Sequence, residues 1–417
     1  MTAHASWAIW AIVSTSTALV LIRPYDWPEA IWAVAGAAAL VVLRLLPADV
    51  AWHAVGQGSD VYLFLTGMML LSEIGREAGL FDWAAALAVG HARGSGWRLF
   101  ALVYGVGVVV TTFMSNDAAA VVLTPAVVAA ARKARIDPLP NLFACAMVAN
   151  AASFVLPMSN PANIVLYGNH TPALGAWLRS FLLPSLASIV VTYLALGWTQ
   201  RRALAARCRK EVRAPALDGR GRLALAGIVA TAIVLLVVSS RDIPLGPPTA
   251  VMGGLTAAAV WLKGRSSPVA TIRSVNWAVL PLVAGLFVLV AALDATGIVD
   301  TLAAALGALA RGGVREAAAI AGTLLAVGSN ATNNLPAGLV ASAVIGRLQP
   351  DRLIVDALLI GVDLGPNLSV TGSLATILWL VNVRRAGLDV SFWQFLKVGL
   401  VAMPAALAAA LAARLWM

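Results

Sequence analysis

The segment DLGPNLSVTGS (Asp363–Ser373) interrupts a long apolar stretch in the second half of the chain. Its proline and glycines remove or weaken helical hydrogen bonds, so a helix that enters this segment is expected to break inside it. A kink that served packing alone would not need Asn and Ser side chains beside the glycines. The segment therefore predicts a membrane helix broken near its middle, with carbonyl groups free for a ligand or an ion.

The composition of the whole chain places this broken helix in a membrane. Of the 417 residues, 60% are hydrophobic and only 12% are charged, whereas soluble domains are nearer half apolar and a quarter charged. Apolar runs long enough to cross a hydrocarbon core of about 30 Å recur from Trp7 to Trp416. These runs do not alternate as barrel strands would, so we predict an all-α, polytopic membrane protein.

The basic residues lie in short segments between the apolar spans, and they give the chain a formal net charge of +10. That placement sets membrane orientation and argues against nucleic acid as a partner. The run Trp7–Ile22 has no basic residue before it and no Ala-x-Ala site after it, so we expect it to remain as a helix. Cys145 and Cys208 are too few for a disulfide framework and fit no metal spacing. The sequence predicts neither a metal nor a cofactor.

An internal repeat relates the two halves of the chain at an offset of 218 residues. The aligned pairs are Gly67 with Gly285, Gly79 with Gly297, Asp82 with Asp300, Arg93 with Arg311, Gly94 with Gly312, and Asn116 with Asn334. After a deletion of five residues, Ser159–Ile164 aligns with Gly372–Ile377. A repeat of this kind is common among secondary transporters.

We divide the chain into repeat 1 (1–198), a basic linker (199–222) and repeat 2 (223–417). Each repeat is predicted to hold three membrane spans, an amphipathic surface helix, a re-entrant hairpin, a broken span and a last span. The hairpins are expected at about 99–131 and 316–348, and the broken spans at about 142–167 and 353–383. Five crossings per repeat invert the second repeat relative to the first.

The distribution of Lys and Arg predicts how the chain is oriented in a bacterial inner membrane. The linker 199–222 holds eight basic residues, so it is expected on the cytoplasmic side. In this orientation most of the 29 Lys and Arg residues lie on the cytoplasmic side, and both termini face outward. An alternative that counts each hairpin as two full spans puts both termini inside, and the sequence leaves it open.

Polar residues gather at four places at membrane depth, where they are costly and tend to mark function. Two are the predicted hairpin tips, at 111–117 and 329–336, and two are the predicted helix breaks, at 157–163 and 363–373. Asparagine and serine side chains there offer hydrogen-bond donors and acceptors. The predicted substrate-binding residues are Ser115, Asn116, Ser159, Asn160, Asn163, Asn330, Asn333, Asn334, Asn367 and Ser373.

Two acids lie within apolar spans, where a charged side chain costs about 2.5 to 3.5 kcal/mol to insert. We predict that Asp117 and Asp363 carry a proton. Two structural alternatives stay open: Asp117 caps the second arm of the first hairpin, and Asp363 accepts a hydrogen bond from unwound backbone. Glu73 and Arg76 have helical spacing near a cytoplasmic end and are interpreted as part of an interfacial ion network.

Around these four places the chain resembles the arsenite efflux permeases of the ion transporter superfamily, the membrane subunit of bacterial arsenical pumps. The resemblance is carried by Asp363–Asn367 with Gly372–Trp379, Asn116–Asp117 with Leu123–Pro125, Ser159–Asn160 with Asn163–Val165, and Asn333–Asn334 with Pro336. It covers nearly the whole chain in order. At Ser369–Val370 the chain departs from the Thr-Pro pair expected before the Gly-Ser.

The resemblance implies export of trivalent arsenite or antimonite by alternating access, driven by proton antiport. It admits a cytosolic ATPase and a second copy of the chain as partners. Arsenite is a neutral trihydroxide at neutral pH, which suits amides and hydroxyls better than a cationic clamp. No cysteine lies at the four places, so capture of arsenic by thiolate is not expected. An acid at the first tip, Asp117, would repel a dicarboxylate.

Other functions fit the residues less well. A sodium-coupled carboxylate transporter or a sodium/proton antiporter of the same superfamily is the main alternative. A passive channel suits a continuous pore better than paired, opposed breaks. The chain contains no His-Glu-x-x-His, Gly-x-Ser-x-Gly or nucleotide-binding loop, so an enzyme is not expected.

Overall fold

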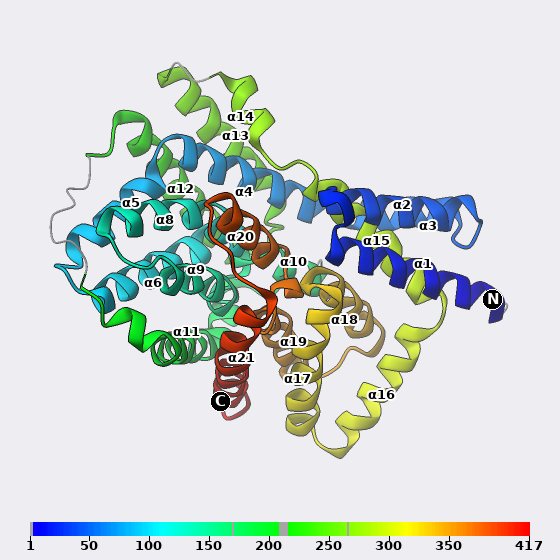
Figure 1. Ribbon diagram of the computed structural model, residues 1–417. Helices are drawn as coiled ribbons and strands as arrows, with labels where there is room; N and C mark the ends of the chain where they lie inside the picture. The colour runs from blue at the N-terminus through cyan, green and yellow to red at the C-terminus, as the bar shows by residue number, and fades with distance from the viewer. Residues whose placement is uncertain (1–2, 169–170, 208–215, 265–266) are drawn as a thin grey trace.

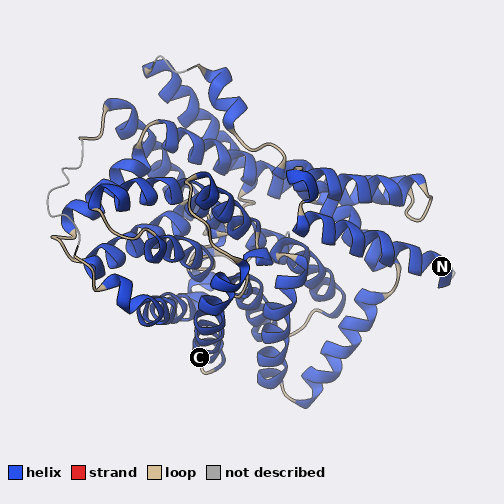
Figure 2. Ribbon diagram, viewed as in Figure 1, coloured by secondary structure: helices blue, strands red, loops and turns tan. Residues whose placement is uncertain are grey.

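A computed structural model describes residues 3–168, 171–207, 216–264 and 267–417 (Figure 1). The elements of these residues are all helices, joined by loops (Figure 2). The predicted all-α membrane fold is therefore confirmed. Cys208 and the part of the basic linker that holds Arg209, Lys210 and Arg213 lie outside the described residues.

The first half of the chain runs from α1 to α11, with a helical hairpin and a broken helix in its second part. Its helices are α1 (Ala3–Ile22), α2 (Glu29–Val42), α3 (Ala48–Gln57), α4 (Ser59–Glu77), α5 (Leu80–His91), α6 (Gly96–Phe113), α7 (Asn116–Ala118), α8 (Thr124–Ala134), α9 (Leu139–Ala151), α10 (Pro161–Tyr167) and α11 (Leu174–Leu204). A short π-helical turn, Ala119–Leu123, joins α7 to α8. We call α6 to α8 hairpin 1, and residues 152–160 the first break.

The second half repeats this order of elements from α12 to α21. Its helices are α12 (Gly219–Ser239), α13 (Gly246–Lys263), α14 (Pro268–Ser274), α15 (Val279–Ala295), α16 (Ile298–Gly312), α17 (Val314–Thr332), α18 (Asn334–Leu348), α19 (Arg352–Leu364), α20 (Leu374–Arg385) and α21 (Phe392–Leu415). We call α17 and α18 hairpin 2, and residues 365–373 the second break. The short 3₁₀ turns Gly365–Asn367 and Val370–Gly372 lie within this break.

The two halves pack against each other reciprocally. Helix α4 of the first half packs on α13 of the second, and α15, which corresponds to α4, packs on α2, which corresponds to α13. In the same way α10 packs on α18 of hairpin 2, and α20 packs on α7 and the π-helical turn of hairpin 1. Reciprocal contacts of this kind are expected of two halves related by a pseudo-two-fold axis.

Glycines let the paired helices approach closely. A Cβ atom on Gly67 of α4 would lie 2.2 Å from the carbonyl oxygen of Thr249 in α13, and one on Gly285 would lie 2.8 Å from the backbone of Ala33 in α2. A Cβ on Gly361 of α19 would lie 2.2 Å from a carbonyl oxygen of α17. Small residues at helix crossings are typical of membrane proteins, where packing replaces the hydrophobic drive.

Helices of membrane-crossing length occur in both halves. Six stretches of the described residues are long and apolar enough to cross a bilayer: His4–Ile22, Gly96–Phe113, Leu174–Leu204, Gly219–Ser239, Pro268–Ala295 and Phe392–Leu415. Large apolar side chains remain exposed on α1, α11, α12 and α13, as expected for a surface in contact with lipid. The chain is therefore a multi-pass membrane protein, whereas the five crossings per repeat and the direction of the termini stay predictions.

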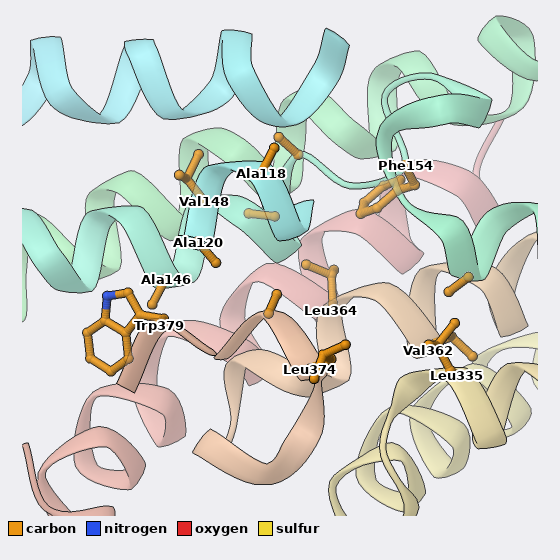
Figure 3. Packing of buried hydrophobic residues seen from close by; sticks show 14 of the residues in the cluster. Ala118, Ala120, Ala146, Val148, Phe154, Leu335, Val362, Leu364, Leu374 and Trp379 are labelled. Carbon is orange, nitrogen blue, oxygen red and sulfur yellow. The ribbon is translucent and has the colours of Figure 1, made fainter. Parts of the chain in front are cut away.

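The core lies where hairpins and broken helices meet. Figure 3 shows buried side chains of hairpin 1 (Ala118), the first break (Phe154) and the helices beside the second break (Leu364, Leu374) close to one another. Trp379 of α20 is fully buried against Phe143 of α9, with ring centroids 5.8 Å apart. This apolar packing surrounds the polar backbone of both breaks and excludes lipid from it.

A buried ion pair connects three helices of this core. Asp356 of α19 is fully buried and accepts hydrogen bonds from the Tyr167 hydroxyl of α10 at 2.6 Å and from the Arg414 guanidinium of α21 at 2.8 and 2.9 Å. The carboxylate is thus compensated from two sides, which a buried charge requires. The contacts link α10, the second half of the first broken helix, to α19 and α21.

Replacing Asp356 by alanine leaves the Arg414 guanidinium without its buried partner, at a cost of about 3 to 5 kcal/mol. We expect purified D356A to unfold at a clearly lower temperature than the wild-type protein in detergent, as measured by tryptophan fluorescence. Asp389→Ala is the control, because it removes an exposed pair with Arg384 at 3.7 Å that is worth about 1 kcal/mol or less. Equal shifts in the two variants would contradict the role of Asp356.

Candidate functional site

The tips of the two hairpins have the same backbone strain at equivalent positions. Ser115 in hairpin 1 has a φ of 148°, and Asn333 in hairpin 2 has a φ of 77°. Each residue then caps the arm that follows, since the Ser115 hydroxyl accepts from the Ala118 amide at 3.4 Å and the Asn333 side chain accepts from the Leu335 amide at 3.3 Å. Strained backbone of this kind persists where the surrounding structure holds it, often at ligand sites.

Asn116 and Asn334 stand directly after these two tips. Both side chains are buried, although they belong to opposite halves of the chain. The Asn116 side-chain oxygen accepts from the backbone amide of Asp117 at 2.9 Å, so part of its hydrogen-bonding capacity serves the tip itself. Its amide nitrogen is a donor that this bond does not use.

Asn330 holds hairpin 2 onto the second break. Its amide donates to the carbonyl oxygen of Gly365 at 3.0 Å, and its side-chain oxygen accepts from the Ser369 amide at 3.2 Å and hydroxyl at 2.8 Å. The Thr371 hydroxyl in turn donates to the Asn330 carbonyl oxygen at 3.1 Å. Backbone groups freed by the break are therefore satisfied by a side chain of the hairpin.

The first break is closed by its own side chains and by hairpin 1. The Asn163 amide donates to the carbonyl oxygen of Ser153 at 2.8 Å and lies 3.3 Å from two more carbonyl oxygens of the loop. The Ser159 hydroxyl donates to the Thr112 carbonyl oxygen of hairpin 1 at 2.9 Å. Each hairpin is thus tied to the break of its own half.

Equivalent residues begin the short helices that follow the breaks. The Asn160 side chain accepts from the Ala162 amide at 3.0 Å and caps α10, and the Ser373 hydroxyl accepts from the Thr376 amide at 3.2 Å and caps α20. Both caps are buried. Helix N-termini carry partial positive charge, and α10 and α20 both begin inside the molecule.

The two breaks are joined by hydrogen bonds between fully buried side chains. Asp363 of α19 accepts from the Ser153 hydroxyl at 2.6 Å and from the Asn160 amide at 2.8 Å. The Asn150 amide of α9 donates to the side-chain oxygen of Asn367 at 2.9 Å, and the Asn367 amide donates to the Met147 carbonyl oxygen at 3.0 Å. We call these residues the central network.

Two buried amide oxygens at the first break have no hydrogen-bond partner within the described part of the chain. They are the side-chain oxygens of Asn150 and Asn163. Buried polar atoms are almost always paired with protein or water. Both atoms are therefore acceptors available to water or to a hydroxyl group of a ligand.

A cavity of about 120 Å³ lies between hairpin 1, α4 and the segment before α15. Its polar lining comes from Ser115 and Asp117 of hairpin 1, from Ser72 and Glu73 of α4, and from Ser274 and Asn276. Pro161 and Leu374, the first residues of α10 and α20, close its inner end. We call this space the hairpin 1 cavity.

A second cavity, of about 430 Å³, corresponds to the first under the pseudo-two-fold relation. Elements α3, α4, α10, α15 and α18 line it, and these are the counterparts of the elements beside the hairpin 1 cavity. Its polar side chains are His53, Gln57, Asp60, Asp294 and Ser342. The two cavities lie at opposite ends of α4 and α15, because one reaches Glu73 and Val279 and the other Asp60 and Asp294.

The structure separates the two acids for which we predicted proton transfer. Asp117 lines the hairpin 1 cavity, whereas Asp363 lies in the central network with both carboxylate oxygens hydrogen-bonded. Among the ten predicted substrate-binding residues, only Ser115 lines that cavity, and five hold or join the breaks through the contacts above. These five are Ser159, Asn160, Asn163, Asn330 and Asn367.

Sequence reasoning missed Ser153 and Asn150 of the central network. Asn150 could have been found, because alignment of α9 with α19 places it on Asp363. Ser153 could not, because nothing in the local sequence indicates which side of a loop faces the other half. The predicted ion pair of Glu73 with Arg76 is present, but the sequence did not indicate that Glu73 also lines the hairpin 1 cavity.

Comparisons with known proteins agree on a membrane transporter. The family described as "Citrate transporter" (CitMHS) matches residues 17–365. The chain is 28% identical to an uncharacterized transporter of Mycobacterium tuberculosis over 98% of this chain and 97% of that protein. It is also 28% identical to the arsenical pump membrane protein of Escherichia coli K12, over 94% of each chain. The resemblance expected from the sequence is confirmed.

Solved structures share the fold at low sequence identity. The YdaH transporter of Alcanivorax borkumensis, described as having an unusual topology, matches 96% of this chain and 98% of its own with a TM-score of 0.59 and 16% identity. MtrF of Neisseria gonorrhoeae, described within a class of antimetabolite efflux pumps, matches with a TM-score of 0.53 and 12% identity over 100% of this chain and 95% of its own.

The equivalent caps Asn160 and Ser373 allow a matched test of the central network. Loss of either cap costs about 0.5 to 2 kcal/mol, but Asn160→Ala also removes a hydrogen bond to the Asp363 carboxylate worth about 1.5 to 3 kcal/mol. We expect Asn160→Ala to lower the unfolding temperature in detergent more than Ser373→Ala does. A larger loss for Ser373→Ala would show that Asp363 is not held by Asn160.

Proposed function

The chain belongs to the citrate transporter family, and from that premise we propose that it is a secondary transporter that exports arsenite and antimonite as neutral trihydroxides in exchange for protons. Members of the family and the relatives described above are membrane transporters and not enzymes. The finer proposal of substrate and coupling rests on the chemistry of the two cavities and the breaks.

The charge of the cavities favours a neutral solute over an organic anion. Acids line both cavities, and no Lys or Arg occurs in the described lining of either. Glu73 is paired with Arg76 and Asp294 with Arg347. Asp117 at the first cavity and Asp60 at the second form no ion pair within the described residues, and these two carboxylates would repel a citrate or dicarboxylate anion. A neutral trihydroxide meets no such barrier, and this observation carries the proposal.

Neutral hydrogen-bonding groups at the breaks support the same substrate. Serine hydroxyls and asparagine amides both donate and accept, and the unpaired side-chain oxygens of Asn150 and Asn163 are acceptors for hydroxyl groups. We propose that the substrate binds between the hairpin tips, beside Ser115, Asn116 and Asn334. The family relative in Escherichia coli K12 carries the name arsenical pump membrane protein, which agrees with this substrate class.

We propose that Asp117 and Asp363 couple the substrate to the proton. Protonation from outside neutralises an acid in surroundings of low dielectric constant and favours the conformation that opens inward. Release of the proton inside resets the cycle. Cavities at opposite ends of α4 and α15 suit alternating access, since each would open to one side of the membrane in turn.

The predicted orientation and assembly complete the proposal. The basic linker 199–222 lies on the cytoplasmic side of a bacterial inner membrane, with both termini outside. Repeats 1–198 and 223–417 are related by inversion, and each carries a re-entrant hairpin that enters from its own side. Following the family resemblance, we also propose that a cytosolic ATPase docks on the linker and that the chain forms a homodimer.

Everted membrane vesicles that contain the chain are expected to accumulate arsenite when respiration acidifies their interior. One proton charge that moves through about 100 mV supplies about 2.3 kcal/mol, enough for a gradient of roughly 50-fold. A protonophore should abolish the accumulation. If arsenite accumulates equally with the protonophore and without ATP, proton coupling is wrong.

Asp117→Asn is expected to abolish accumulation while arsenite still equilibrates across the membrane, because the substrate site remains but no proton can be exchanged at the cavity. Asp363→Asn should reduce both coupling and thermal stability, since Asp363 also joins the breaks. Asp389→Asn, an exposed carboxylate between α20 and α21, is the control and should transport normally. Normal proton-coupled uptake by both of the first two variants would remove them from the mechanism.

The family's description as citrate transporters favours a second candidate, a sodium-coupled carboxylate transporter. The coupling ion distinguishes this candidate from the proton-coupled arsenite exporter. The same vesicles, given an imposed sodium gradient and labelled citrate at constant pH, should show no sodium-dependent uptake if our first proposal holds. Uptake of citrate that follows the sodium gradient would select the second candidate, and sodium/proton exchange without citrate would select an antiporter.

A further inference from the structure

A groove with basic walls lies between the last helices of the two halves, and it shares no lining residue with the cavities described above. Its volume is about 520 Å³. The carboxyl-terminal end of α11 and the first turns of α21 form it, and these helices pack side by side (Figure 1). Its lining residues are Trp198, Thr199, Gln200, Arg201, Arg202, Ala203, Lys397, Val398 and Val401.

Three cations line this groove, and its described lining contains no carboxylate. Arg201, Arg202 and Lys397 are exposed, and none of them forms an ion pair within the described residues. Lys397 lies in the second turn of α21, a helix of membrane-crossing length that begins at Phe392. A cation at that position is costly unless its head group reaches the interface or an anion.

An aromatic side chain places the groove at the edge of the bilayer. The indole ring of Trp198 is 60% exposed, and the Arg201 guanidinium carbon lies 5.4 Å from its centroid. Trp393, one helical turn before Lys397, is 66% exposed. Exposed tryptophans of membrane helices gather at the level of the lipid head groups, so the cations stand at the depth of lipid phosphates.

We propose that the groove binds one anionic phospholipid. The head-group phosphate accepts hydrogen bonds from Arg201, Arg202 and Lys397, and an acyl chain lies along Val398 and Val401. Guanidinium groups suit phosphate oxygens because they donate in a fork. A zwitterionic lipid fits less well, since its own ammonium group meets three cations.

The position of the groove gives the bound lipid a structural consequence. Helix α11 is the last helix of the first half of the chain, and α21 is the last helix of the second half. A phosphate held by Arg201 and Arg202 on one side and by Lys397 on the other would bridge the two halves at a point where no buried polar contact of the described residues joins them. The lipid therefore stabilises the packing of α11 against α21.

Native mass spectrometry of the full chain in detergent tests this site with phosphatidylglycerol as the probe and phosphatidylcholine as the neutral comparison. We expect one phosphatidylglycerol molecule to stay bound and to raise the unfolding temperature. The triple variant Arg201→Gln, Arg202→Gln, Lys397→Gln should lose it, because each cation near a membrane surface strengthens binding about fivefold and the three together by roughly 100-fold.

A matched triple variant separates this site from general surface charge. Arg273→Gln, Arg384→Gln and Arg385→Gln remove three basic residues from α14 and the end of α20, and this variant should retain the lipid. The proposal would be overturned if the first triple variant kept phosphatidylglycerol as well as the wild-type protein does, or if the second triple variant lost it to the same extent as the first. It would also be overturned if the wild-type protein kept phosphatidylcholine as well as phosphatidylglycerol. If the first triple variant does not fold, single Lys397→Gln protein must show about fivefold weaker binding with an unchanged lipid-free unfolding temperature.

Discussion

The absence of water in the membrane core is the constraint on which the rest of this structure depends. Every backbone group that a helix break sets free must find a partner inside the protein. The chain meets this demand with side chains: Asn330 donates to the Gly365 carbonyl oxygen of the second break, Asn163 donates to the Ser153 carbonyl oxygen of the first, and Ser159 donates to the Thr112 carbonyl oxygen of hairpin 1. The polar residues that we propose bind the substrate and those that satisfy the backbone are therefore neighbours.

The two halves share a fold but differ in chemistry where they meet. Asn150 and Asp363 occupy equivalent places in α9 and α19, yet one is an amide and the other an acid. The acid accepts two hydrogen bonds from the first break, and the amide instead donates to Asn367. One buried carboxylate can be satisfied by surrounding donors, whereas two facing carboxylates at this depth would repel each other. The difference between the halves gives a symmetric fold one titratable group at its centre.

The cavities differ in size as well as in lining. The hairpin 1 cavity measures about 120 Å³ and its counterpart about 430 Å³. The two cavities therefore do not follow the pseudo-two-fold relation of the helices around them. An alternating-access protein must be asymmetric in any one conformation, because the two entrances cannot be open together. Under the proposed function, the acids at both cavities would select against anions in either conformation, so charge selection would not depend on the transport cycle.

The sequence by itself determined the fold class and the positions of the breaks. Apolar length demanded helices. Gly365 and Pro366 end α19 inside the predicted break 363–373, whereas α9 ends at Ala151, six residues before Pro157 of the predicted break 157–163. Local chemistry of this kind acts within a few residues, so it can be read from the chain. Only the tertiary structure decided that Asp363 would meet Ser153 and Asn160, that Asp117 would instead share a cavity with Glu73, and that five of the ten predicted binding residues would hold or join the breaks. Asp363 lies more than 200 positions from Ser153 and Asn160, and that pairing follows from how the two halves pack, which no local pattern encodes.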